Sequence, residues 1–233
     1  MLHRVVCLQF AGATLSLNST ANGAGNRRRV SNTISGAGTV SIDNTTSGIN
    51  GGWVAFTSSS SGLTAGFTGT VNVNSGVLTM DNYAGIWSSS ANLNVASGGL
   101  FAIRGQSLTV ASLSGAGDII NSWNGNGAQT FTVNNSGANS FTGNIHGSVA
   151  SGGVDGSIEQ GIINLVKSGA GTLTLSGANT YTGTTTVNAG TLQLSGTSTL
   201  GSGNYASAIS IASGATLQYS SSVAQALSGI ISG

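Results

Sequence analysis

Proline is absent from the 233 residues, and charged side chains make up only 5% of them. Disordered chains usually combine low hydrophobicity with high net charge. This chain has neither, because 39% of its residues are hydrophobic and its formal net charge is +1. A nearly neutral chain also offers no general field that attracts phosphate backbones or anionic lipids. We therefore expect a folded protein that does not bind nucleic acid.

Cysteine is almost absent as well, with Cys7 as the single residue of its kind. No disulfide can therefore form within the chain, and stability must come from packing and backbone pairing. Long apolar runs are also missing: no stretch approaches the roughly 18 residues of a membrane helix. Gln9, Thr14 and Ser16 interrupt the apolar residues near the start. We predict neither a signal peptide nor direct membrane insertion.

Glycine, in contrast, is abundant, with 38 residues, and its positions mark internal repeats. The first repeat unit is Ser-Gly-Ala-Gly, at residues 35–38, 114–117 and 168–171. The second is Gly-Ala-Asn-Ser/Thr-Phe/Tyr-Thr-Gly, at 137–143 and 177–183, with an echo at 66–69. The third is a strand, a turn with glycine and another strand, at 71–80, 185–194 and 209–219. Repeats of this kind indicate an architecture of stacked units.

Apolar residues in these units alternate with Thr, Ser, Asn or Gln, a period of two that sends neighbouring side chains to opposite faces of a strand. Helical spacing is nowhere sustained, and each interior glycine would cost a helix about 1 kcal/mol. Equivalent leucines, Leu192 and Leu217, are far enough apart for three short strands and their turns. The pattern predicts an all-β fold: a right-handed, three-sided parallel β-helix (solenoid) with about nine coils. We also expect Asn179 and Asn188 to stack into amide ladders.

The whole chain, 1–233, is predicted to be one solenoid segment. It is irregular in 1–33, has a loop insertion near 146–160, and shows its clearest repeat at 165–219. Both ends have the composition of solenoid coils without Pro or charge to block strand pairing. We therefore expect a truncated segment that associates end to end.

Residues 165–196, Leu-Val-Lys-Ser-Gly-Ala-Gly-Thr-Leu-Thr-Leu-Ser-Gly-Ala-Asn-Thr-Tyr-Thr-Gly-Thr-Thr-Thr-Val-Asn-Ala-Gly-Thr-Leu-Gln-Leu-Ser-Gly, resemble the passenger-associated β-strand repeat of autotransporters. The resemblance implies a type V secreted bacterial surface protein. Its passenger would fold as a β-helix and reach the cell surface or the extracellular space through an outer-membrane barrel that lies outside this segment. It also implies partners: neighbouring coils or domains of the parent chain, and a host surface or glycan.

Ionisable residues are too scattered to suggest catalysis. The acids Asp43, Asp81 and Asp118 stand alone among Ser, Asn and Gly, and we predict that they lie in turns. His146, Asp155 and Glu159 share one interval, but their spacing matches no standard ligand pattern. We predict no catalytic, cofactor-binding or metal-binding residues, no cofactor and no enzyme activity. The function expected is a structural stalk or an adhesin-like passenger segment.

The alternative function is a carbohydrate-binding or carbohydrate-active β-helix protein, because solenoid enzymes place acids and bases along a groove and aromatic rings stack on sugars. Six aromatic residues are candidates for such a surface: Trp53, Tyr83, Trp87, Trp123, Tyr205 and Tyr219. An outward threonine row, Thr182 and Thr184 to Thr186, is a further possibility for binding ice. The basic run at 27–29 is interpreted as a solvated loop.

The period-two register places six residues in the interior: Leu173, Leu175, Val187, Leu192, Leu194 and Leu217. We predict that Leu192→Asp lowers the free energy of unfolding by several kcal/mol, because it buries an unpaired charge. Thr184→Ala, on the outward side, should change it little. Urea unfolding of both variants tests this. Equal destabilisation would contradict the assignment of inside and outside.

Overall fold

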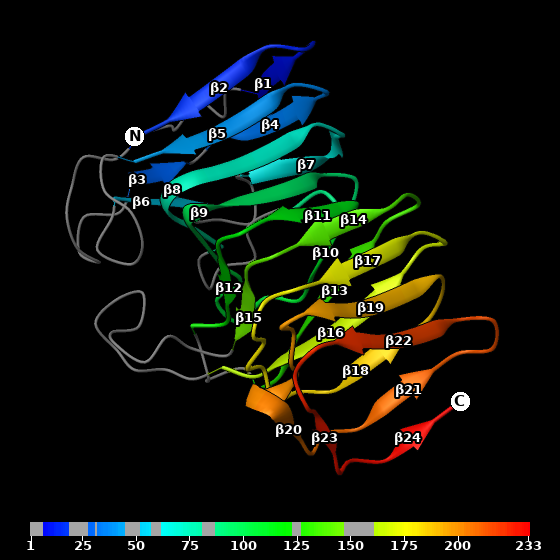
Figure 1. Cartoon of the computed structure of the whole chain (residues 1–233). Coiled ribbons are helices and arrows are strands. Elements are labelled where there is room, and N and C mark those ends of the chain that lie inside the picture. Colours follow the sequence, from blue (N-terminus) through cyan, green and yellow to red (C-terminus); the bar gives the residue numbers. More distant parts are fainter. Residues whose placement is uncertain are drawn as a thin grey trace.

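A computed structural model describes residues 7–18, 28–30, 32–44, 52–56, 62–80, 87–122, 127–146 and 161–233. Every strand pairing in it is parallel, and each strand pairs with a strand of a neighbouring coil. Figure 1 shows the coils stacked along one axis, from the first strands (blue) to the last (red). The predicted all-β parallel β-helix is therefore confirmed. The handedness and the total number of coils stay predictions.

Each coil contributes strands to three sides. Side one contains β1 (Cys7–Phe10), β4 (Thr33–Gly36), β7 (Gly62–Phe67), β10 (Leu108–Val110), β13 (Gln129–Asn134), β16 (Ile163–Ser168), β18 (Thr185–Val187), β21 (Ile209–Ile211) and β24 (Ile231–Ser232). Side two contains β2 (Thr14–Leu17), β5 (Thr39–Asp43), β8 (Thr70–Met80), β9 (Asn92–Ala102), β11 (Ser112–Gly115), β14 (Asn139–Phe141), β17 (Thr172–Leu175), β19 (Thr191–Gly196) and β22 (Thr216–Ser221).

Side three contains β3 (Arg28–Val30), β6 (Trp53–Phe56), the second halves of β8 and β9, β12 (Asp118–Ile120) and β15 (Asn144–His146). In the later coils its place is taken by β20 (Asn204–Tyr205) and β23 (Ala226–Leu227). A short 3-10 turn, Gly201–Gly203, precedes β20.

Apolar side chains form columns along the interior, because equivalent positions of successive coils stack in register. On side two Leu173 pairs with Leu192, and Leu192 pairs with Leu217. Leu173, Leu175, Val187, Leu192 and Leu194 are buried as predicted, and Leu217 is partly buried against the same core. Full burial of a residue of this size stabilises the fold by about 1.5–3 kcal/mol. These side chains become buried only when neighbouring coils stack on one another.

One interior column contains a lysine. Lys167 lies between Val133 and Val187 on side one and is fully buried. Its Nζ donates to the carbonyl oxygens of Ser168 (2.7 Å), Gly169 (2.8 Å) and Ala189 (3.2 Å). Burial lowers the pKa of this amine, since it is removed from water. The three carbonyl groups compensate the charge at a corner between sides one and two.

A second interior column contains a threonine, which corrects part of the predicted outward row. Thr185 lies between Leu165 and Ile209 and is buried, whereas Thr182 and Thr184 are exposed. Its hydroxyl hydrogen-bonds the Tyr181 and Tyr205 hydroxyls, both at 2.8 Å. Burial raises the pKa of both tyrosines. Thr185 thus provides a partner for the buried Tyr181 hydroxyl, whereas the Tyr205 hydroxyl also donates to the carbonyl oxygen of Gly183.

Glycines allow close contact between coils at the corners. A Cβ built on Gly143 would lie against the carbonyl oxygen of Gly117, closer than the 3.0 Å that real Cβ atoms respect. Gly69 lies in the same way on Gly38. Ser-Gly-Ala-Gly on one coil is therefore covered by Phe-Thr-Gly on the next. The two copies of the second repeat, at 137–143 and 177–183, do not stack on each other. Phe141 of the first copy pairs with Leu175 and not with Tyr181 of the second.

We expect Gly143→Ala to lower the free energy of unfolding by about 3 kcal/mol, because the new methyl group would push the two coils apart. Gly137→Ala, in the same repeat unit, is the matched control, since no atom lies within 4 Å of the added carbon. Chemical unfolding followed by circular dichroism gives both values. Similar stability of the two variants would contradict the close contact.

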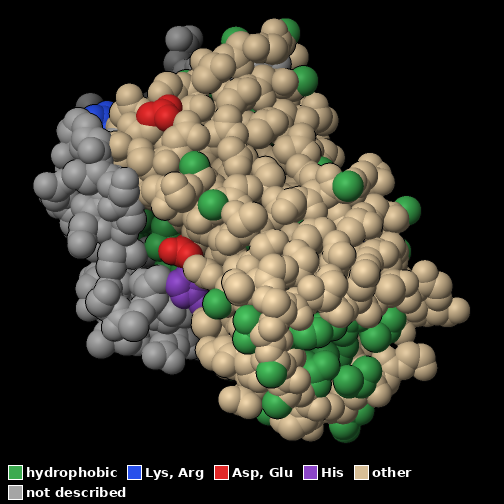
Figure 2. Space-filling view, viewed as in Figure 1, with side chains coloured by type: hydrophobic (Ala, Val, Ile, Leu, Met, Phe, Trp, Pro, Cys, Tyr) green, Lys and Arg blue, Asp and Glu red, His purple; other side chains and the backbone are tan. Residues whose placement is uncertain are grey.

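Apolar side chains are exposed on the last described coil. Figure 2 shows this patch as a green area at the end that carries β22 to β24. Its exposed members are Tyr219, Val223, Leu227, Ile230 and Ile231, with Ile230 the most accessible at 77%. No Asp, Glu, Lys, Arg or His follows Lys167 in the sequence. No charged side chain therefore opposes pairing at this strand edge.

The 233-residue protein is expected to associate as its concentration rises, since this patch and strand edge can pack on another coil. Light scattering against concentration measures the mass. Ile230→Lys should shift association to higher concentration by placing a charge on the patch, whereas Thr184→Lys, on an exposed side position, should not. A monomer at every concentration would show that association does not occur.

Candidate functional site

The predicted ionisable interval is only partly described. His146, the last residue of β15, places its Nε2 3.6 Å from Oδ1 of Asp118, the first residue of β12. Asp155 and Glu159 lie outside the described residues, as does Asp81. Asp118 and Asp43 both belong to strands and not to turns, which corrects the sequence interpretation. The two strands are neighbours on side three, so the ion pair bridges adjacent coils.

Opposing effects act on the Asp118 carboxyl. Burial raises its pKa, but the hydrogen bond and charge of His146, together with a hydrogen bond from Asn144 Nδ2 (3.3 Å), bring the pKa below its ordinary value. The contact therefore links β12 to β15 on the adjacent coil. Among the described residues no three His, Cys, Asp or Glu side chains lie close enough to hold a metal ion.

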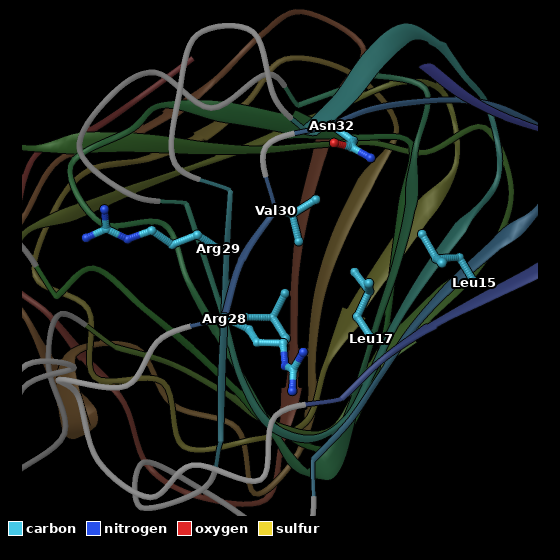
Figure 3. Close-up of a pocket in the computed structure, with 7 residues that line it drawn as sticks. Leu15, Leu17, Arg28, Arg29, Val30 and Asn32 are labelled. Atoms are coloured by element: carbon cyan, nitrogen blue, oxygen red, sulfur yellow. The ribbon is translucent and has the colours of Figure 1, made fainter. Parts of the chain in front are cut away.

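A pocket of about 230 Å³ opens at the first coils (Figure 3). Leu15, Leu17 and Val30 point into this space, and Arg29 points away from it. The leucines and Val30 are partly buried members of the interior columns. The pocket thus borders the interior columns at the first described coils. It is smaller than the roughly 300–1,000 Å³ of most ligand sites.

The basic run forms part of a strand and not of a loop. Arg28 and Arg29 belong to β3, pair with Val54 and Ala55 of β6, and are exposed. Arg27 lies outside the described residues. The sequence interpretation that the run is solvated holds for the two described arginines, but the loop assignment was wrong.

Neutral polar side chains cover the outward face of side two. Asn94 Nδ2 donates to Asn72 Oδ1 (3.3 Å), and Ser114 Oγ donates to Asn94 Oδ1 (3.4 Å). Thr174 Oγ1 donates to Gln193 Oε1 (3.0 Å) in the same position of later coils. These contacts form side-chain ladders between coils. The face presents hydroxyl and amide groups, with Asp43 bonded to Ser16 and Asn74 near its start.

The amide ladder predicted for Asn179 and Asn188 was placed on the wrong residues. Asn188 is exposed. Asn179 is buried; its Oδ1 accepts from Ile145 N (3.1 Å), and its Nδ2 donates to Gly177 O (2.9 Å) and Ser198 Oγ (3.3 Å). The Asn179 side chain thus hydrogen-bonds backbone N–H and C=O groups at a corner, where strand pairing does not satisfy them.

The predicted aromatic surface is not continuous in the described residues. Trp53 and Tyr205 are buried, Tyr219 is exposed in the last coil, and Trp87 lies in a separate cleft. Tyr83 and Trp123 lie outside the described residues.

Sequence reasoning missed a second apolar cluster, on the outward face of side three. Its buried members are Trp53, Val77, Leu100, Ala102 and Ile120. The signal was present in Trp-Val-Ala-Phe (53–56), where both faces of the strand are apolar. Such a run is typical of a strand buried on both faces.

Residues 165–194 match the family described as passenger-associated-transport-repeat. This stretch comprises most of β16, all of β17 and β18, and most of β19. The match confirms that the chain contains an autotransporter passenger repeat, as the sequence resemblance predicted. No curated protein and no solved structure matches the chain. In the part of the chain that is described, no helix is long and apolar enough to cross a membrane.

Acid should weaken the fold partly through Asp118. A carboxyl whose pKa is lowered by folding adds stability above its unfolded value, near 3.9, and this stability is lost as the pH falls through the folded value. The urea midpoint of the wild type should therefore fall more steeply between about pH 5 and pH 2 than that of Asp118→Asn. His146→Gln should flatten the profile in the same way. Parallel profiles for all three proteins would rule out this contribution.

Proposed function

We propose that the chain is a structural, non-catalytic segment of an autotransporter passenger, starting from the passenger-associated-transport repeat at residues 165–194. The repeat is one part of a continuous stack: β16 pairs with β13 on one side and with β18 on the other. Its apolar residues lie in the same interior columns as those of the coils around it. This continuous stack supports the role of a long, rigid structural element.

The distribution of chemistry supports a scaffold. Side two offers neutral hydroxyl and amide groups, and several of the described ionisable side chains are engaged within the fold. Lys167 binds backbone carbonyls, Asp118 pairs with His146, and Asp43 accepts from Ser16 and Asn74. General acid–base catalysis requires a positioned acid and base at a substrate. We infer that the segment acts as a stalk at the cell surface or outside the cell.

The partners that we propose are further coils or domains of the passenger. The exposed apolar patch of the last coil fits such a neighbour, because each inner coil buries the same positions against the next one. A surface role in adhesion, toward a host surface or glycan, would add to the stalk and not replace it.

A coil deletion tests the stalk role. Removing residues 165–184 takes out one coil, because Leu165 and Thr185 are partners in the side-one register. β18 then follows Asn164 directly and can pair with β13 in place of β16. We expect the shortened protein to keep β-sheet circular dichroism and cooperative unfolding, with a modest fall in Tm, because stability in a solenoid is a sum over repeats and their interfaces.

The control removes about half a coil, residues 165–175, which deletes β17 and most of β16 and leaves an incomplete coil. This variant should lose cooperative unfolding. If both deletions unfold the protein, the segment is not a modular stalk.

Location needs a separate test on cells that express the parent protein. An antibody against residues 1–233 should label intact cells or the culture medium, and external proteinase K should remove the cell-bound signal. Labelling only after permeabilisation would exclude a surface role.

A further inference from the structure

In the part of the chain that is described, side one has a break between β7 and β10. β1, β4 and β7 form one sheet, and the six strands from β10 to β24 form another. Trp87 and Ser88 lie across this break and link its two sides with side-chain hydrogen bonds. Ser88 Oγ donates to Phe67 O (2.6 Å), and Trp87 Nε1 donates to Thr109 O (3.0 Å).

A cleft of about 390 Å³ lies beside the break, within the usual size of a small-molecule site of roughly 300–1,000 Å³. Its lining residues are Met80, Trp87, Ser89, Gln106, Ser107, Leu108 and Thr109. Met80 and Leu108 are buried, whereas Ser89 and Ser107 are exposed. The cleft therefore has an apolar floor and an uncharged polar rim.

The turn that forms one wall has an unusual backbone. Gln106 N donates to Ile103 O (3.0 Å), and both residues between them have positive φ: 37° at Arg104 and 73° at Gly105. A side chain at positive φ costs energy, and such residues concentrate at functional sites. This conformation places Gln106 and Ser107 together on the rim.

We propose that this cleft binds a neutral sugar unit of a glycan. The indole of Trp87 has its Nε1 proton engaged by Thr109 O, so the ring carbons are what it can offer to a ligand. Carbon surfaces of aromatic rings pack on the C–H face of a pyranose. Trp87 is also fixed by Phe101, whose ring centroid lies 5.1 Å away. The stacking surface is thus held in place before a ligand arrives.

The rim provides hydrogen-bonding groups for sugar hydroxyls. Within the described residues the side chains of Gln106 and Ser89 make no hydrogen bond, which leaves an amide and a hydroxyl for the ligand. Ser107 is held by the fold: its Oγ accepts from Thr130 N (2.9 Å) and donates to Gln129 Oε1 (3.1 Å). None of the described residues that line the cleft carries a charge. A neutral sugar therefore fits better than an anionic one. This inference is independent of the stalk role, which would stand if the cleft were empty.

Nuclear magnetic resonance tests the proposal on the whole 233-residue protein. Glucose, galactose, mannose and N-acetylglucosamine are titrated separately, with glucuronate as the anionic comparison and cyclohexanol as the apolar one. At least one neutral sugar should shift the Trp87 indole N–H signal and the Gln106 side-chain amide signals in a saturable way. The indole signal of Trp53, on side three, should stay in place.

Variants connect the signals to the cleft. Gln106→Ala should raise the Kd by about 2- to 10-fold, the usual effect of one hydrogen bond between neutral groups. Trp87→Phe identifies the indole signal and should weaken binding further, because it removes the bond to Thr109 that orients the ring. Gln218→Ala, an exposed amide on side two, is the control and should bind as the wild type does.

The proposal is wrong if none of the four neutral sugars gives saturable shifts at Trp87 and Gln106. It is also wrong if only cyclohexanol or glucuronate does so, or if Gln106→Ala and Trp87→Phe bind like the wild type. Unchanged amide spectra away from the cleft show that both variants are folded.

Discussion

Stacking of one coil on the next is the interaction on which the rest of this structure depends. A single coil has no second layer to cover its apolar face, so its side chains are buried only along the axis, at the ~4.8 Å spacing of paired strands. The parallel register repeats the same environment at each level: leucine lies on leucine at 173, 192 and 217. The regular backbone pairing therefore determines which side chains face inward, and glycine occurs where two corners meet too closely for a Cβ atom.

Polar residues in the columns show how strictly this register applies. Lys167 and Thr185 occupy inward positions that alternation assigns to apolar residues, and the fold satisfies each of them locally. The amine of Lys167 reaches three carbonyl groups at a corner, and the hydroxyl of Thr185 joins two tyrosines. A buried polar group without such partners would cost about 1–3 kcal/mol. The interior is therefore not a uniform apolar rod.

Sequence reasoning predicted the fold, the alternation and the passenger repeat, because period-two patterns and repeated glycines are local signals. It misplaced features that depend on which residues of neighbouring coils stack on one another. The distance along the chain between stacked residues varies, from 18 between Leu100 and Asp118 to 34 between Phe141 and Leu175, so similar motifs can lie at different corners. The inward position of Thr185 could have been read from its alternation with Val187. The cleft at Trp87 could not, because it depends on how residues from separate coils meet in space.

The register of the coils can be measured by cysteine cross-linking in a Cys7→Ser background. Thr174 and Gln193 are partners on neighbouring coils and lie on the outward face of side two, within the Cα separation that a disulfide allows. Gln218 is the partner of Gln193 one coil farther along. We expect the pair Thr174→Cys with Gln193→Cys to form a disulfide rapidly on mild oxidation, and the pair Thr174→Cys with Gln218→Cys to stay reduced. Cross-linking of the distant pair, or of neither pair, would contradict the stacked register.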